Sequence, residues 1–269
     1  MKTKPYLLLP FAGMLFYACN NQAKHPQADL VNQSSPIPET EQSILQYADS
    51  IDTQQSNMEK KVSLIYQLED FSLYVEKLSW NGKPALYIEH TGDQGLTDRS
   101  ARYYFKADSL LLVRESIKRT KEQETVFEEK RTYLRNNTPF RQERRLAVSF
   151  SSLQTKPFTD VKPSGKIEDY TEKLALLNDA LAGQNKFETV FDQYMPAPEG
   201  QYLLLKSKVP GGYSSSLLVK EEDALIDSIK QYPSLFKDAK LQLKWEISEK
   251  EAIYVPVAAK TTSASGLNR

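Results

Sequence analysis

The sequence predicts an α+β protein in which an N-terminal helix with an antiparallel β-meander precedes a smaller domain of order β-β-α-β-β. Apolar residues at helical spacing between Ile44 and Val62 predict the helix. From Val62 to Val148, runs rich in aromatic and β-branched residues are separated by turn residues, as in a series of hairpins. Beyond Lys166, helical and alternating segments follow one another, which is typical of a mixed helix-and-sheet domain.

The bulk composition is that of a folded protein without a strong net charge. The chain has 269 residues, of which 40% are hydrophobic and 26% charged, so it can bury a substantial core. Basic and acidic residues number 35 each, and this balance argues against nucleic acid as a partner because no basic field would hold phosphates. A single cysteine allows no internal disulfide.

The start of the chain has the pattern of an export signal. Lys2 and Lys4 precede an apolar run, Tyr6–Ala18, which ends at Cys19. This run has 13 residues, and a transmembrane helix needs about 20. It therefore fits the core of a signal peptide, which we place at residues 1–18.

The end of this run resembles the lipid-attachment motif of bacterial lipoproteins, in which small residues precede an acylated cysteine. Ala18 and Cys19 match that motif, whereas Phe16 and Tyr17 are bulkier than its usual residues. The resemblance covers residues 1–19 only and implies that Cys19 is the lipid attachment that holds the protein to a membrane. Because Asn20 rather than Asp follows, it also implies the outer membrane with the protein facing the periplasm. The alternative is an ordinary secretory signal with a chance cysteine.

Composition divides the rest of the chain. Residues 19–38 are predicted to be the lipidated cysteine and a flexible tether, because they are polar and contain three prolines. A helix-plus-meander domain is expected at 39–157, a small α+β domain at 158–258, and a polar tail at 259–269. The boundary between the two domains is placed in Lys156–Lys166, which has two prolines and a glycine.

The predicted first helix carries two acidic residues one turn apart. Its apolar face recurs through Ile44, Ala48 and Ile51. Asp49 and Asp52 could do acid–base chemistry or bind a cation. We interpret them as a solvated helix face, because the sequence places no third ligand or catalytic partner beside them.

Turn residues set the order of the strands. Asn81-Gly82 is the strongest hairpin signal, because both central positions of a type I′ turn need positive φ. In the second domain, a helix over Ile167–Leu181 is expected to end at Gly183, and a short second helix is expected over 187–194. The remaining elements are strands 201–209 and 213–219, a helix 221–232, and strands 241–247 and 252–257.

No reactive cluster is evident, so no catalytic residue, metal site or cofactor is predicted. The chain has two histidines, His25 in the tether and His90 on a strand. Glu89 lies on the opposite sheet face from His90, because side chains alternate along a strand, so the two cannot pair. Nucleophilic catalysis and metal binding both need more than a lone histidine.

Two compositional features are open to a binding role. One is a basic stretch that could hold an anion, although interleaved glutamates favour cross-strand charge pairing instead. The other is a set of strand tyrosines that could line a concave sheet for a glycan or lipid, or serve as ordinary half-buried strand residues. The residues are Arg131, Arg135, Arg141, Arg144 and Arg145, and Tyr66, Tyr74, Tyr87, Tyr103, Tyr104 and Tyr133.

These observations favour a lipid-anchored, non-enzymatic binding or scaffold module of the cell envelope, with the ligand residues unknown. The first alternative is a periplasmic carrier of a lipid or small ligand on a concave sheet. The second is an enzyme that uses carboxylates. Whether the meander is a filled sheet or a hollow half-barrel decides between them.

Overall fold

The computed structural model describes residues 40–122, 124–162, 170–198 and 200–257, and they begin with a capped helix. Helix α2 (Glu41–Gln54) follows Thr40, whose side chain accepts a hydrogen bond from the Ser43 amide at 3.2 Å. Its buried face consists of Ile44, Ala48 and Ile51, as the spacing predicted. A short 3-10 helix (Gln55–Asn57) leads from α2 into the sheet.

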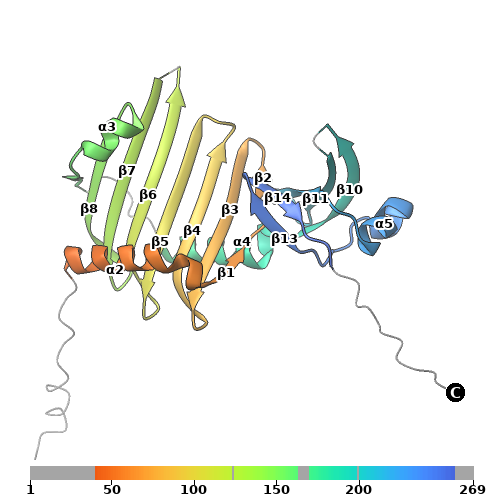
Figure 1. Ribbon diagram of the computed structural model, residues 1–269, viewed down its shortest axis with the longest axis horizontal. Helices are drawn as coiled ribbons and strands as arrows, with labels where there is room; N and C mark the ends of the chain where they lie inside the picture. The colour runs from red at the N-terminus through yellow and green to blue at the C-terminus, as the bar shows by residue number, and fades with distance from the viewer. Residues whose placement is uncertain (1–39, 123, 163–169, 199, 258–269) are drawn as a thin grey trace, which may run out of the picture. The chain divides into compact units, whose positions relative to one another are not determined.

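Six long strands form an antiparallel meander in which each strand pairs with the next one along the chain (Figure 1). The first hairpin turns at Asn81 and Gly82, whose φ values of 50° and 75° are both positive, as a type I′ turn requires. Helix α2 followed by this meander confirms the predicted α+β class with an N-terminal helix and an antiparallel meander. The strands are β3 (Phe71–Trp80), β4 (Lys83–Asp93), β5 (Thr97–Lys106), β6 (Ser109–Lys121), β7 (Glu124–Arg135) and β8 (Thr138–Ala147).

Shorter elements extend the sheet at both sides. β12 pairs with β2, so one hydrogen-bonded path joins the meander to the C-terminal strands. The predicted β-β-α-β-β order is found as β11, β12, α5, β13 and β14. The shorter strands are β1 (Glu59–Val62), β2 (Tyr66–Leu68), β9 (Thr159–Asp160), β10 (Thr189–Ala197), β11 (Gly200–Ser207), β12 (Ser214–Val219), β13 (Trp245–Ser248) and β14 (Glu251–Tyr254). The helices are α3 (Phe150–Thr155), α4 (Tyr170–Ala182), the 3-10 turn Asn185–Phe187, α5 (Ala224–Gln231) and α6 (Pro233–Phe236).

Three local expectations are wrong. The first helix, whose apolar spacing was expected to continue to Val62, ends at Gln54, and Glu59–Val62 forms β1 because it pairs with β3. The segment expected as a short helix forms β10, because its β-branched and aromatic residues pair with β11 through Thr189↔Ser207 and onward. The strand expected from Leu241 begins only at Trp245. Its partner β14 has four residues, and Trp245↔Tyr254 is the last pair, so the residues before it have no ladder to join.

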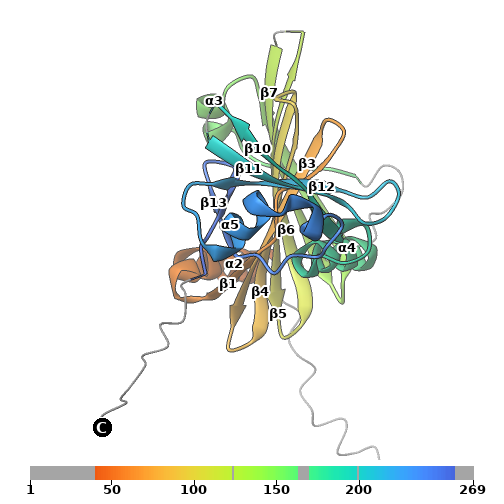
Figure 2. The same cartoon turned by 90° about the vertical axis from the view of Figure 1, so that its right-hand side faces the viewer.

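Helices α2 and α4 lie on opposite faces of the meander, as the two ribbon views agree (Figures 1 and 2). Under α2, the buried cluster includes Leu86, Tyr104 and Leu112. The cluster under α4 includes Tyr87 and Val113, and it continues into the C-terminal strands. Both faces of the meander are therefore filled where a helix crosses them.

Helix α4 ends as predicted. Gly183 has φ +60°, the left-handed conformation of a C-terminal cap, and its amide donates to the Ala180 carbonyl at 3.3 Å. Residues 1–18, 19–38 and 259–269 lie outside the described ranges, so the signal, tether and tail stay predictions. The division of the folded part into two domains, 39–157 and 158–258, also stays a prediction.

Candidate functional site

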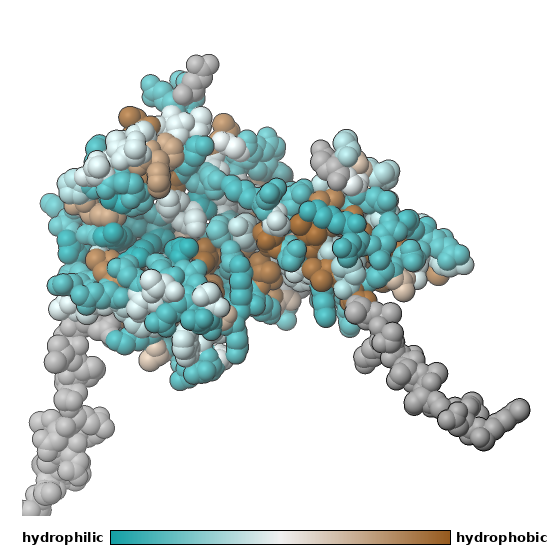
Figure 3. Space-filling model, in the orientation of Figure 1, coloured by the Kyte–Doolittle hydropathy of each residue, from teal (hydrophilic) through white to brown (hydrophobic). Residues whose placement is uncertain are grey.

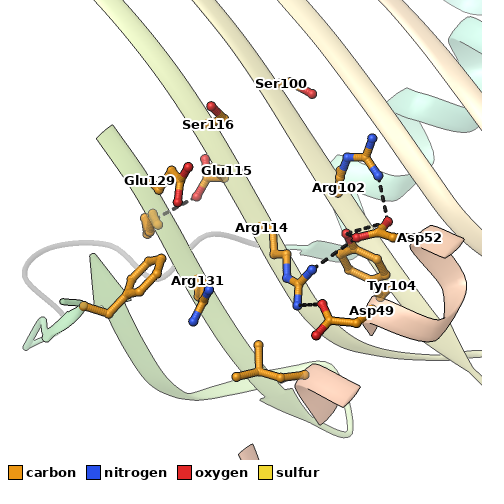
Figure 4. Close-up of a pocket in the computed structure, with 13 residues that line it drawn as sticks. Asp49, Asp52, Ser100, Arg102, Tyr104, Arg114, Glu115, Ser116, Glu129 and Arg131 are labelled. Atoms are coloured by element: carbon orange, nitrogen blue, oxygen red, sulfur yellow. Dashed lines mark hydrogen bonds and ion pairs between the residues drawn. The ribbon is translucent and has the colours of Figure 1, made fainter. Parts of the chain in front are cut away.

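A cavity of about 340 Å³ lies on the sheet face that α2 crosses, and we call it the α2-side cavity. The space-filling view shows this face hollowed and mostly hydrophilic beside α2 (Figure 3). Strand register places its side chains in two rows that run across β5, β6 and β7. One row is Ser100, Ser116 and Glu129, and the other is Arg102, Arg114 and Arg131 (Figure 4).

The wall formed by α2 is held by ion pairs. Asp52 accepts hydrogen bonds from the Tyr104 hydroxyl at 2.9 Å and from Arg102 at 2.7 Å. Arg114 joins both helix carboxylates, with its Nη1 3.2 Å from Asp52 and its Nη2 2.7 Å from Asp49. Burial, followed by the Asp52 carboxylate, raises the pKa of Tyr104 to about 12. The arginines and the tyrosine thus fix α2 on the sheet.

The expectation of a solvated face is correct for Asp49 and wrong for Asp52. The Asp49 side chain is 67% exposed, whereas that of Asp52 is 29% exposed. The partners of Asp52 come from strands some 50 residues further along the chain, and a search of neighbouring sequence positions could not find them.

Charge pairs also close the outer wall of the cavity. Arg131 lies 3.1 Å from Glu143, and Arg145 lies 2.6 Å from Glu129, so the predicted cross-strand pairing is confirmed here. The ring of Phe158 lies under both guanidinium groups, with its centroid 3.7 Å from the Cζ of Arg131 and 4.7 Å from that of Arg145. The structure brings these two arginines together at the cavity.

The other three arginines of the basic stretch are placed differently. Arg141 donates to Asp160 at 2.9 Å near the start of β8. Arg135 lies over the Phe140 ring at the hairpin end, 4.3 Å from its centroid. By register, Arg144 is opposite Lys130 and so belongs to the other sheet face. The basic stretch is therefore not one patch.

The cavity retains hydrogen-bonding groups without partners in the described part of the chain. The hydroxyls of Ser100 and Ser116 have none, and the Nε of Arg114 is buried with none. A buried donor that lacks a partner costs free energy, which a ligand oxygen would recover. The cavity is thus suited to a polar ligand.

A second cavity, of about 260 Å³, surrounds His90, and we call it the His90 cavity. The His90 ring stacks on Tyr74 with centroids 4.3 Å apart, and its Nε2 lies 3.2 Å from Glu76. The hydrogen bond with His90 and the charge of Lys60 hold the pKa of Glu76 at about 2, against the effect of burial. Glu89 lies on the opposite face, as predicted.

Glu89 belongs to a buried charge network under α4. Its carboxylate accepts hydrogen bonds from Arg99 at 2.7 Å, Tyr103 at 2.8 Å and Lys173 at 2.6 Å. Although burial opposes ionisation, Lys173 and Arg99 hold the pKa of Glu89 below its usual range. With 2% of the Glu89 side chain exposed, this network fixes α4 to the sheet and does not face a ligand.

The six strand tyrosines all lie on strands, as predicted. Five of them are buried in the two cores, which agrees with the ordinary structural interpretation. Tyr74 is the half-buried one of the six and lines the His90 cavity, and the buried Tyr104 lines the α2-side cavity.

Cys19 lies outside the described residues, so its lipid attachment stays a prediction. None of the described helices has the length and apolar character that crossing a membrane requires. Within the described ranges, no three histidine, cysteine, aspartate or glutamate side chains are grouped to hold a metal ion. Comparisons with protein-family models, curated proteins and solved structures gave no match.

The sequence interpretation missed the centre of the α2-side cavity. Arg102 and Arg114 face each other across β5 and β6, and Ser100 faces Ser116 in the next row. Neither pair can be recognised without knowing the register of β5 and β6. Sequence reasoning did single out four residues that line the cavity, namely Asp49, Asp52, Tyr104 and Arg131.

Proposed function

We propose that the protein is a lipid-anchored, non-enzymatic binding module of the cell envelope, and that its ligand site is the α2-side cavity. The observation that carries this proposal is a cavity of about 340 Å³, within the usual range for ligand pockets, that is lined by ion-paired side chains. Anchoring rests on the resemblance of residues 1–19 to bacterial lipoproteins, with Cys19 acylated and the folded part in the periplasm.

The pairing of the carboxylates favours binding over catalysis. A general base must be free to take a proton, yet Asp52 already accepts hydrogen bonds from four side chains and Glu129 is held by Arg145. The same charges disfavour a lipid carrier, because lipid chains need an apolar cavity. A polar ligand can form hydrogen bonds with Ser100, Ser116 and the arginines.

Ser116 offers a direct test, because it is exposed, central to the cavity and has no partner within the described chain. Ser116→Trp should fill the cavity without breaking an ion pair. Ser228→Trp, at a half-buried serine of α5 that does not line the cavity, is the control. Full-length chains are purified from envelopes in mild detergent, with and without crosslinking.

Native mass spectrometry and crosslinked partners are then compared between the variants. We expect wild type and Ser228→Trp to retain the same bound species or partner, and Ser116→Trp to lose it. If the bound species is a lipid that survives Ser116→Trp, the carrier alternative replaces this proposal. If Ser116→Trp changes neither measurement, the α2-side cavity is not the binding site.

A further inference from the structure

The two cavities adjoin through one row of side chains that crosses the sheet. Ser100 lines the α2-side cavity, and its cross-strand partner His90 lines the other. Successive pairings extend this row over six neighbouring strands on a single face. The row is Tyr74, His90, Ser100, Ser116, Glu129 and Arg145.

The length of this row suits a chain rather than a single small molecule. Neighbouring strands lie about 4.8 Å apart, so the part of the row that lines the cavities, Tyr74 to Glu129, crosses five strands and spans roughly 19 Å. On the sixth strand, Arg145 is covered, because it donates to the carbonyls of Gln154 and Lys156. The α2 helix runs along one side of the row, because the next row carries Arg102 and Arg114, which bind α2. An elongated groove therefore runs parallel to the helix.

The charge along the groove is balanced. Apart from Asp93, the carboxylates along the groove each have a cation beside them in the described residues, so no surplus of positive charge attracts a polyanion. The pairs are Lys60–Glu76, Arg102–Asp52, Arg114–Asp49, Arg131–Glu143, Arg145–Glu129 and Lys250–Asp98. An uncharged chain can bind here without displacing an internal salt bridge.

The free groups of the groove are hydroxyls and aromatic rings. The hydroxyls of Tyr74, Ser100 and Ser116 have no partner in the described residues, and each can both donate and accept. Rings lie near both ends, with Tyr74 on β3 and Phe158 beside β8. A peptide that binds by β-strand addition is disfavoured, because that mode needs a free sheet edge and the backbone of this face is already paired.

We infer that the α2-side cavity and the His90 cavity form one groove that holds an extended, uncharged, hydroxyl-rich chain, that is, a neutral glycan. This inference rests on the proposed function of the α2-side cavity. It adds the class of ligand and assigns Tyr74 and His90 to the same site.

Chain length is the variable that tests it. The full-length protein in mild detergent is titrated with maltohexaose and with the hexamer of N-acetylglucosamine, and with the disaccharide of each. We expect a hexamer to bind at least about tenfold more tightly than its disaccharide, because only the hexamer reaches both cavities. Tyr74→Ala should weaken the hexamer by about three- to tenfold, the range for loss of an aromatic contact, and leave the disaccharide unchanged.

Ser116→Trp should abolish binding of both lengths, and Ser228→Trp should change neither. Equal affinity for hexamer and disaccharide, or no effect of Tyr74→Ala, would overturn the groove while the α2-side cavity could still bind a ligand. Binding of dextran sulfate or of an unstructured peptide in place of both neutral hexamers would overturn the glycan class. Absence of binding to every neutral probe would overturn it as well.

Discussion

Asp52 gives the sharpest test of how the site is assembled. Its carboxylate meets Tyr104, Arg102 and Arg114, and its side chain is 29% exposed. Removing one partner of a fully buried ion pair costs about 3–5 kcal/mol. Because Asp52 keeps some contact with solvent, we expect Asp52→Ala to lower the free energy of unfolding by about 2 kcal/mol.

Asp49→Ala is the matched control on the same helix. Its side chain is 67% exposed and it meets only Arg114, so we expect a loss below about 1 kcal/mol. Both substitutions gain the same helix propensity, which therefore cancels in the comparison. If the m-value is near 2 kcal/mol/M, urea denaturation should place the midpoint of Asp52→Ala about 1 M below that of wild type, and the midpoint of Asp49→Ala less than about 0.5 M below it.

The reasoning fails if Asp52→Ala is as stable as Asp49→Ala, or more stable than wild type. Such a result would mean that burial of Asp52 is a cost to the fold rather than a docking contact. A carboxylate kept at a cost to stability is a mark of function, so the carboxylate-based enzyme would then become the better hypothesis.

Three further outcomes are expected. Cys19→Ala should release the protein from membranes and abolish labelling with radioactive palmitate; unchanged pelleting and labelling would refute the lipid anchor. The pKa of Glu76 is about 2 in the folded protein and 4.5 in an unfolded chain, so the stability that ionised Glu76 contributes is present above about pH 4.5 and is lost as the pH falls toward 2. For Glu76→Gln, the free energy of unfolding should therefore fall less steeply with decreasing pH in this window than for wild type. A Cβ at Gly212 would lie 2.7 Å from the Lys186 carbonyl oxygen, whereas a Cβ at Gly211 would meet nothing within 4 Å, although Gly211 has a φ of +65°. Thermal unfolding should therefore show a loss of about 3 kcal/mol for Gly212→Ala and about 1 kcal/mol for Gly211→Ala. Equal losses would contradict the close packing at Gly212.

Local signals in the sequence were enough to predict much of the fold. The spacing of Ile44, Ala48 and Ile51 predicted the buried face of α2, and Asn81-Gly82 predicted a hairpin that has the required φ values. Both are short-distance patterns, because a helix face and a two-residue turn depend on residues close in the chain. The same reasoning overextended the strand at Leu241, where the end of β14 decides the outcome.

The arginine row could not be predicted in this way, because bulges decide it. Counting back from the two-residue turn at Ala107-Asp108 would pair Arg102 with Val113. The structure shifts register between Tyr104 and Phe105, and Arg102 instead lies opposite Arg114. A one-residue shift moves every following side chain to the other face.

The hairpin of β7 and β8 shows a register shift of the same kind. The turn at Asn136-Asn137 alone would pair Arg131 with Gln142, but a shift between Tyr133 and Leu134 places Arg131 opposite Glu143. Two irregularities near hairpin ends therefore align the charged residues of four strands, β5 to β8. The turn residues alone do not predict these register shifts.

The open groove follows from the proportions of a helix laid across a sheet. Strands of about ten residues are roughly 33 Å long, whereas a helix is about 10 Å wide with its side chains. Helix α2 can therefore cover about a third of this face, and Leu86, Tyr104 and Leu112 form the buried row beneath it. Among the described helices, α3 also packs on this face, where Gln154 contacts Glu129 and Arg145 on β7 and β8. Beside α2, the arginines that bind the helix form the edge of the cavity, and Ser100 and Ser116 in the next row line it, so this part of the face is polar rather than apolar. Because a lipid carrier would need apolar residues in that same part of the face, the distribution of side chains favours a polar chain as the ligand.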